Sequence, residues 1–131
     1  MPGVTPTIPV SWGELLDKMT ILAIKRERIE APAARANVDR EYAALSRIGE
    51  AVLEQAGVAA AYENLRRVNE DLWRIEDAIR EEEAGGRFGD AFVALARSVY
   101  RRNDERAAIK RRINLLLESE LVEEKSYRSF A

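Results

Sequence analysis

Four stretches of helical periodicity constrain the fold of this chain most strongly. In each stretch apolar residues recur every three to four positions, and Pro or Gly separates one stretch from the next. We expect helices from the cap at Ser11 to about Glu30, and over about residues 34–55, 59–83 and 90–118. The sequence contains no run of alternating apolar and polar residues and no Asn-Gly or Asp-Gly hairpin turn, so we expect no β-strand. Short connections make successive helices antiparallel neighbours. The sequence therefore predicts an all-α fold, an antiparallel up-and-down bundle of about four helices.

The predicted helices differ in length, and this difference shapes the expected domain. The third and fourth are the longest and meet across Gly85-Gly86, so we expect a long helical hairpin. We expect a single domain over residues 1–131, with an extended lead at 1–10, the bundle at 11–118 and a C-terminal tail at 119–131. Four apolar residues of the tail are candidates to dock on the bundle: Leu121, Val122, Tyr127 and Phe130.

The first predicted helix carries a clear start signal and two apolar seams. Ser11 and Glu14 have the spacing of a capping box, in which each side chain bonds the other residue's backbone amide. Ile21 and Ile24 lie outside the main apolar stripe and form a second seam. A helix with two seams is either central in its own bundle or shared with another chain. We therefore predict a homodimer or higher oligomer formed through Ile21 and Ile24, and we leave a different protein partner open.

Composition excludes several kinds of chemistry. The chain has no Cys and no His, so disulfides, thiolate chemistry, His or Cys zinc sites and Ser-His-Asp arrangements are ruled out, and we expect no metal and no cofactor. The net charge of −2 gives no overall attraction to nucleic acid or to an anionic membrane. No apolar run approaches the length of a membrane span. We expect no signal peptide, and we predict a cytoplasmic location.

The apolar stripe of the fourth helix is interrupted by polar residues, which is the strongest functional signal in the sequence. At helical spacing the stripe passes from Val99 to Asn103, Arg106 and Lys110 before it becomes apolar again at Ile113. A buried guanidinium without a partner is costly, so Arg106 requires a carboxylate or a bound anion opposite it. Two alternatives remain open. The polar residues form either a structural network that fixes helix register or an internal site for an acidic ligand.

Candidate partners for Arg106 lie on the third and first helices. Counting outward from the turn near residue 87 places Asn69 as the direct neighbour of Arg106, with Glu76 closer to Val99. Glu76 and Asp17 are the candidate counter-charges, and a polar layer of Asn69, Asn103 and Arg106 follows. Together with Lys110, these residues are the candidate ligand-binding set. Asp17 and Lys18 are otherwise expected to belong to a solvated face of the first helix.

Basic residues are frequent on the fourth helix, but we rank nucleic-acid binding last. Asp104 and Glu105 interrupt the basic residues, which surround the helix rather than sharing one face. The third helix is acidic, so salt bridges between the two helices explain the charges without a nucleic acid.

Four segments mix polar and apolar positions in a recognisable way: residues 11–22, 69–77, 96–110 and 123–127, none of which lies in the second predicted helix. These segments resemble a family of small, uncharacterised bacterial helical proteins. The resemblance implies no assigned activity, and it implies a loose association with gene clusters for surface polysaccharides or glycosyl transfer. The first helix is also superficially similar to that of chorismate-mutase-type helical dimers, although no Arg precedes the Asp17 segment and the helix lengths differ.

We therefore predict a non-catalytic interaction or assembly module with an internal polar cluster. The alternative is a small-molecule enzyme or sensor that binds a carboxylate or phosphate ligand through Asn103, Arg106 and Lys110. The sequence does not decide between them.

Overall fold

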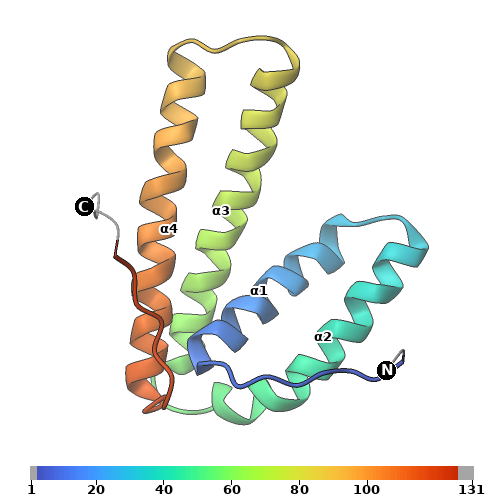
Figure 1. The fold of residues 1–131 in the computed structure, drawn as a ribbon, viewed down its shortest axis with the longest axis vertical. Helices are drawn as coiled ribbons and strands as arrows, with labels where there is room; N and C mark the ends of the chain where they lie inside the picture. The colour runs from blue at the N-terminus through green and yellow to red at the C-terminus, as the bar shows by residue number, and fades with distance from the viewer. Residues whose placement is uncertain (1–2, 127–131) are drawn as a thin grey trace.

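The computed structural model describes residues 3–126 and consists of four α-helices, with no strand in that part of the chain. The helices are α1 (Trp12–Arg28), α2 (Pro32–Leu53), α3 (Val58–Ala84) and α4 (Asp90–Leu116). Successive helices run antiparallel and pack as the hairpins α1/α2 and α3/α4 (Figure 1). The predicted all-α, four-helix fold is confirmed, including the longer third and fourth helices.

The helix ends follow local sequence signals. Ser11 caps α1 by accepting a hydrogen bond from the Glu14 amide at 3.1 Å, as predicted. α1 ends at Arg28, two residues earlier than expected, because Ile29 is already extended ahead of Pro32, the first residue of α2. α4 begins at Asp90, and Gly89 occupies its N-cap position without a side-chain hydrogen bond.

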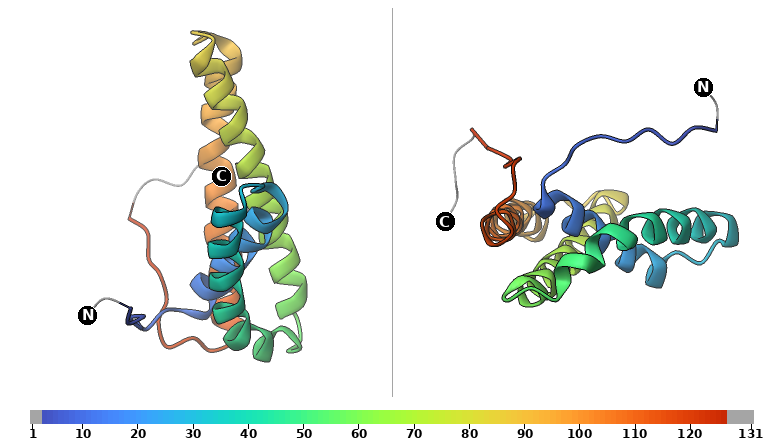
Figure 2. Two further views of the ribbon diagram at one scale, coloured as in Figure 1. Left: turned by 90° about the vertical axis from the view of Figure 1, so that its right-hand side faces the viewer. Right: turned by 90° about the horizontal axis from the view of Figure 1, so that it is seen from below.

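The two hairpins diverge from a shared base. α3 and α4 rise together past the other helices, whereas α1 and α2 lean away from them (Figures 1 and 2). The sequence predicted a bundle but not this divergence, because apolar stripes show which faces are buried without fixing the angle between hairpins.

The hydrophobic core lies at the base, where the hairpins meet. Its fully buried side chains include Leu16, Met19, Leu65 and Ile113, one or more from each of α1, α3 and α4. α2 approaches α1 closely at Gly49, where a Cβ atom would lie 2.2 Å from the Met19 sulfur. The absence of a side chain at Gly49 thus allows the α1/α2 hairpin to close over the core.

α1 is central in the fold, and this position accounts for its two seams. It packs against α2, α3 and α4. Ile24 is buried, with 1% of its surface exposed, while Ile21 remains partly exposed. The second seam is therefore largely used inside the chain, and a dimer through Ile21 and Ile24 stays a prediction.

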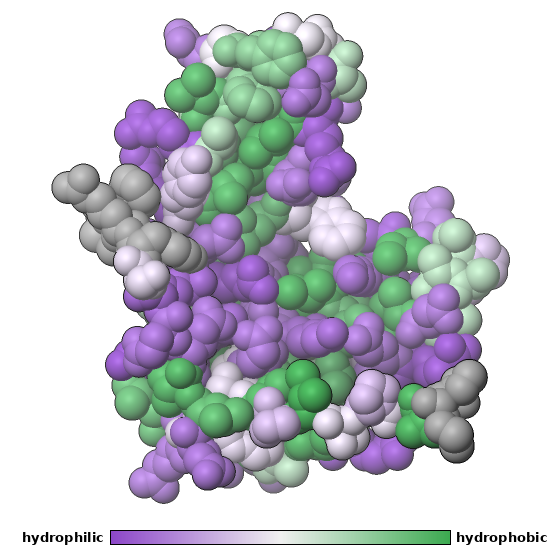
Figure 3. Space-filling view, viewed as in Figure 1, coloured by the Kyte–Doolittle hydropathy of each residue, from purple (hydrophilic) through white to green (hydrophobic). Residues whose placement is uncertain are grey.

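The outer part of the α3/α4 hairpin, residues 70–109, is here called the arm. None of its residues is buried, although Leu72, Ile75, Ile79, Leu95 and Val99 form an apolar seam between its two helices. Hydrophobic residues are visible along the arm in the space-filling view (Figure 3). α1 reaches only the foot of the arm, where Ile21 and Ile24 lie beside Leu72 and Val99. Above that level the arm is a two-helix layer that no other described helix covers.

The segment after α4 turns back along that helix (Figure 1). Leu121 and Val122 are both exposed, so they do not dock in the predicted way, and the tail is held by polar contacts described below. Tyr127 and Phe130, the other predicted docking residues, lie outside the described residues. None of the helices within residues 3–126 is long and apolar enough to cross a membrane.

Candidate functional site

Arg106 meets a buried carboxylate, which is that of Asp17 on α1. The Arg106 Nε lies 2.9 Å from Asp17 Oδ1, and Nη2 lies 2.5 Å from Oδ2. This is a two-bond fork, the strongest geometry available to Arg and a carboxylate. Asp17 is 1% exposed, while the Arg106 side chain is 28% exposed. The pair joins α1 to α4 across 89 residues of sequence.

Asn69 and Thr20 complete the surroundings of Asp17. The Asn69 amide nitrogen donates to Asp17 Oδ1 at 2.9 Å and to the Thr20 hydroxyl at 2.7 Å. The Thr20 hydroxyl donates in turn to the Asp17 carbonyl at 2.7 Å. We refer to Asp17, Thr20, Asn69 and Arg106 as the polar cluster. It links α1, α3 and α4 through one carboxylate.

The polar cluster is internally satisfied. Hydrogen bonding to Asp17 raises the pKa of Arg106 above its already high value, and this effect exceeds the opposing effect of burial. Within residues 3–126, no buried side-chain nitrogen or oxygen lacks a hydrogen-bond partner. The cluster therefore holds its charges in a finished network rather than presenting a bare cation.

Lys110 takes part in a separate charged group at the base of α4. Its amine lies 2.8 Å from a Glu14 carboxylate oxygen and 3.1 Å from one of Glu123 in the tail. Burial alone lowers the pKa of Lys110, but the hydrogen bonds to Glu14 and Glu123 and the negative charges of Asp17 and Glu14 together raise it above its ordinary value. Glu14 thus pairs with Lys110 rather than completing the predicted capping box.

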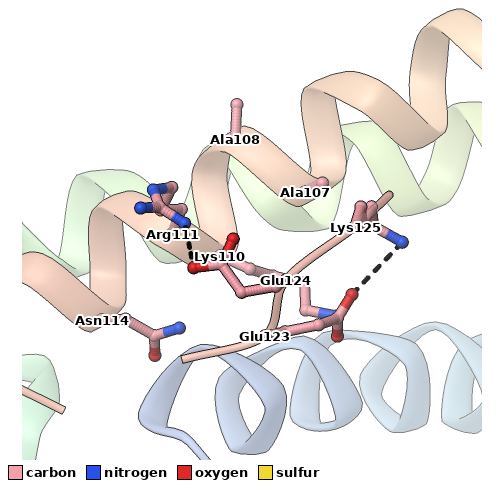
Figure 4. Close-up of a pocket in the computed structure, with 8 residues that line it drawn as sticks. All are labelled: Ala107, Ala108, Lys110, Arg111, Asn114, Glu123, Glu124 and Lys125. Carbon is pink, nitrogen blue, oxygen red and sulfur yellow. Dashed lines mark hydrogen bonds and ion pairs between the residues drawn. The ribbon is translucent and has the colours of Figure 1, made fainter. Parts of the chain in front are cut away.

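The tail covers this lysine and leaves a shallow pocket of about 240 Å³ between itself and α4 (Figure 4). Glu124 reaches Arg111 at 3.3 Å, and Lys125 lies 3.2 Å from Glu123. Both cations on the α4 side of this pocket, Lys110 and Arg111, are therefore neutralised by tail carboxylates. The pocket offers no uncompensated positive charge to an anion.

The first turn of α1 is completed by residues from the far end of the chain. The Gly13 amide donates to Asn114 Oδ1 at 2.7 Å, and the Trp12 amide donates to Ser119 Oγ at 3.2 Å. These bonds satisfy amides that a helix start leaves open. Gly13 makes the approach possible, because a Cβ atom there would lie 2.5 Å from the Lys110 carbonyl oxygen. The helical pattern does not indicate Asn114 or Ser119 as capping residues; the glycine inside the capping box is the one local sign of this close approach.

A groove lies between α1 and the foot of the arm, and we call it the notch. Its volume is about 390 Å³. Apolar side chains from three helices share it with amides, carboxylates and Arg106; the lining residues are Ile21, Ile24, Asn69, Leu72, Trp73, Glu76, Asp77, Val99, Asn103 and Arg106. The Arg28 guanidinium lies over the Trp73 ring, 5.8 Å from its centre, at the end of α1.

The structure separates the predicted site residues into three groups. Asp17, Asn69 and Arg106 meet in the polar cluster, but Asn69 bonds Asp17 rather than serving as the direct partner of Arg106. Glu76 pairs with Arg80 on its own helix and is not the counter-charge. Asn103 lines the notch, and no described residue hydrogen-bonds its side chain. Lys110 belongs to the tail contacts.

The expectation of a solvated face at Asp17 and Lys18 is wrong for Asp17 and right for Lys18. Lys18 is exposed and pairs with Glu41 at the surface. Asp17 is buried because α1 is covered by α3 and α4 on that side, which the helix pattern of α1 alone does not reveal.

The fold and the cluster define a class of protein: a small helical protein whose internal charges are neutralised by its own side chains. No group of three or more acidic residues within residues 3–126 is arranged to hold a metal ion.

The chain belongs to a family of unknown function (DUF6165), whose model matches residues 7–130. This match confirms the resemblance to an uncharacterised family, while the gene-cluster association stays a prediction. No curated protein and no solved structure matches the chain significantly.

Proposed function

We propose that this protein is a non-catalytic assembly module that binds a protein partner along the arm and the notch. The observation that carries the proposal is that the arm, residues 70–109, contains no buried residue despite its apolar seam. A two-helix layer with one half-covered seam gains stability when another helix packs on it. The polar cluster then serves to hold α1 against α3 and α4 at the foot of the arm.

The state of Arg106 supports assembly over anion binding. A site for a carboxylate or phosphate ligand needs cationic donors that are free to turn to the ligand. Arg106 already directs Nε and Nη2 at Asp17, and Lys110 is held between Glu14 and Glu123. An acidic ligand would have to displace these carboxylates.

A small-molecule function has one observation in its favour, which is the notch itself. Asn103 and Trp73 line this groove, and an amide beside an aromatic ring can recognise a polar ligand with an apolar face. We keep this as the second candidate.

A thermal-shift screen separates the two functions. We expect no saturable stabilisation of the full chain by inorganic phosphate, a dicarboxylate or a sugar nucleotide. A saturable shift that is lost in Asn103→Ala would overturn the assembly proposal in favour of a ligand site. Ser98→Ala is the matched control, because Ser98 also lies on α4 but only bonds its own helix backbone.

A further inference from the structure

Charge, rather than apolar packing, holds the tail to α4. Glu123 meets Lys110 at 3.1 Å, and Glu124 meets the next residue of the helix, Arg111, at 3.3 Å (Figure 4). Val122, which precedes the two carboxylates, is 39% exposed, so it adds no buried apolar contact. Ion pairs with exposed partners contribute little to stability. This part of the tail can therefore leave α4 at a small cost.

The firmly held part of the tail ends at Ser119. The Ser119 amide donates to the Asn114 carbonyl at 2.8 Å, and the Ser119 hydroxyl oxygen accepts from the Trp12 amide at 3.2 Å. Residues 121–126, in contrast, form neither a helix nor a strand. The segment that carries the two carboxylates can thus detach while the cap of α1 stays in place.

The tail fills the pocket beneath it only in part. About 240 Å³ stays open between the tail and α4. Asn114 lines this space although it is 3% exposed, and its side-chain oxygen is fixed by the hydrogen bond from the Gly13 amide. The Asn114 amide nitrogen reaches the pocket (Figure 4), and no described residue accepts a hydrogen bond from it. A donor that a buried side chain directs into an open space is suited to an acceptor from another molecule.

Departure of the tail would leave this pocket basic. Lys110 would keep Glu14, whose carboxylate lies 2.8 Å away, whereas Arg111 would lose its ion pair with Glu124. Two cations and the Asn114 amide would then face one carboxylate. Such a set of donors is complementary to an acidic group that approaches from outside.

We infer that the pocket is a binding site for an acidic segment of a partner protein, and that the tail occupies it as a built-in competitor. The segment presents two neighbouring carboxylates, as the tail does with Glu123 and Glu124. Ala107 and Ala108 line the pocket with small side chains, so the backbone of a segment can lie close to α4. The site is separate from the notch, and none of its charged residues lies on the arm.

The tether of the tail sets the threshold for such a partner. A segment on the same chain competes at an effective concentration in the millimolar range, as short flexible linkers provide. An acidic peptide with a weaker affinity than this leaves the tail in place. A partner that also accepts the Asn114 hydrogen bond and fills the open volume displaces it, so the tail restricts the site to partners that fit well.

The first experiment uses a peptide with the sequence of residues 119–126 as the probe. Its binding is followed by the amide chemical shifts of the isotope-labelled full chain. The variant with Glu123→Gln and Glu124→Gln, here called the loosened variant, lacks the two carboxylates that compete with the probe. We expect saturable shifts near Arg111, with a Kd about fivefold or more below that of the wild type. The control probe has Gln at the positions of both residues and should bind about fivefold more weakly or worse.

The second experiment tests which cation recognises the probe. Arg111→Ser in the loosened variant should weaken binding by about threefold to tenfold, because one charged contact is lost. Arg112→Ser is the matched control, because Arg112 is also exposed and basic but does not line the pocket, and it should change the Kd by less than about twofold. Lys110 is kept, since its side chain is only 11% exposed and its removal would disturb the fold. Circular dichroism verifies that the variants remain folded.

Several results would overturn the inference. They are equal binding of the probe to the loosened variant and the wild type, equal binding of the two probes, and equal weakening by Arg111→Ser and Arg112→Ser. Inorganic phosphate that binds the loosened variant as tightly as the probe assigns the pocket to small anions instead. A wild-type dimer in light scattering that the loosened variant loses makes the tail of a second copy the ligand, in place of a different protein. None of these measurements involves the notch, so their outcome is independent of the proposed assembly function.

Discussion

Replacing Arg106 by methionine leaves the Asp17 carboxylate buried with Asn69 as its remaining side-chain donor. Asp17 is 1% exposed, so water cannot replace the two lost bonds without a rearrangement of the helices. Breaking such a buried pair from one side costs about 3–5 kcal/mol of unfolding free energy. The reverse change, Asp17→Asn, should cost less, about 1–3 kcal/mol, because Arg106 is 28% exposed and can turn towards water.

Urea unfolding followed by tryptophan fluorescence at fixed protein concentration measures this difference. With a slope of about 1–3 kcal/mol/M, a loss of about 3 kcal/mol lowers the midpoint by roughly 1–3 M. The double variant Asp17→Leu with Arg106→Met removes both charges, and it should be less destabilised than the sum of the single variants by about 2 kcal/mol or more.

Arg102→Met is the matched control for Arg106→Met. Arg102 also lies on α4 and contacts two carboxylates, those of Glu105 and Asp71, but it does so at the surface. Its removal should cost less than about 1 kcal/mol. If Arg106→Met costs no more than Arg102→Met, or if the double variant is simply additive, the polar cluster does not hold the helices together in the way we describe.

Three further predictions concern other contacts. Gly13→Ala should cost about 1–3 kcal/mol in chemical denaturation, because its Cβ would meet the Lys110 carbonyl at 2.5 Å, whereas Gly89→Ala, with open space around it, should be nearly neutral. The hydrogen bond from Lys110 lowers the pKa of Glu123 below its ordinary 4.5. The contact between Glu123 and Lys110 therefore stabilises the fold above pH 4.5, and this stabilisation is lost as the pH falls through the lowered pKa. A Glu123→Gln variant should differ from the wild type in thermal unfolding at neutral pH and match it in acid. Burial raises the pKa of Tyr62 from 10.0 to about 12, so the folded state favours the neutral phenol. The folded state should therefore lose stability as the pH rises from 10.0 towards 12, and this loss should be smaller in Tyr62→Phe. A Tyr62→Phe variant with the same alkaline stability profile as the wild type would contradict this account.

The helices and their order were predictable because they follow from local patterns. The cap at Ser11, the break before Pro32 and the turn at Gly85-Gly86 each depend on residues only a few positions apart. The sequence also indicated that Arg106 needs a carboxylate, since the cost of an unpaired buried guanidinium does not depend on the details of the fold.

The identity of that carboxylate was not predictable in the same way. Asp17 meets Arg106 through the packing of α1 across the α3/α4 hairpin, and no periodicity within one helix encodes this crossing. Counting outward from a turn works only for the two helices that the turn joins, which is why it favoured Asn69. Asn114 was missed for the same reason, because it caps a helix about a hundred residues earlier in the chain.

The distant capping of α1 also bears on the order in which the protein is made. The amides of Trp12 and Gly13 find their partners 107 and 101 residues later in the chain, and Asp17 finds Arg106 after 89. At a synthesis rate of about 5–20 residues per second, roughly 4–18 seconds pass between the synthesis of Asp17 and that of Arg106. Among the four helices, α1 is therefore synthesised first and completed last, and its apolar seams stay exposed to chaperones until α4 has been made.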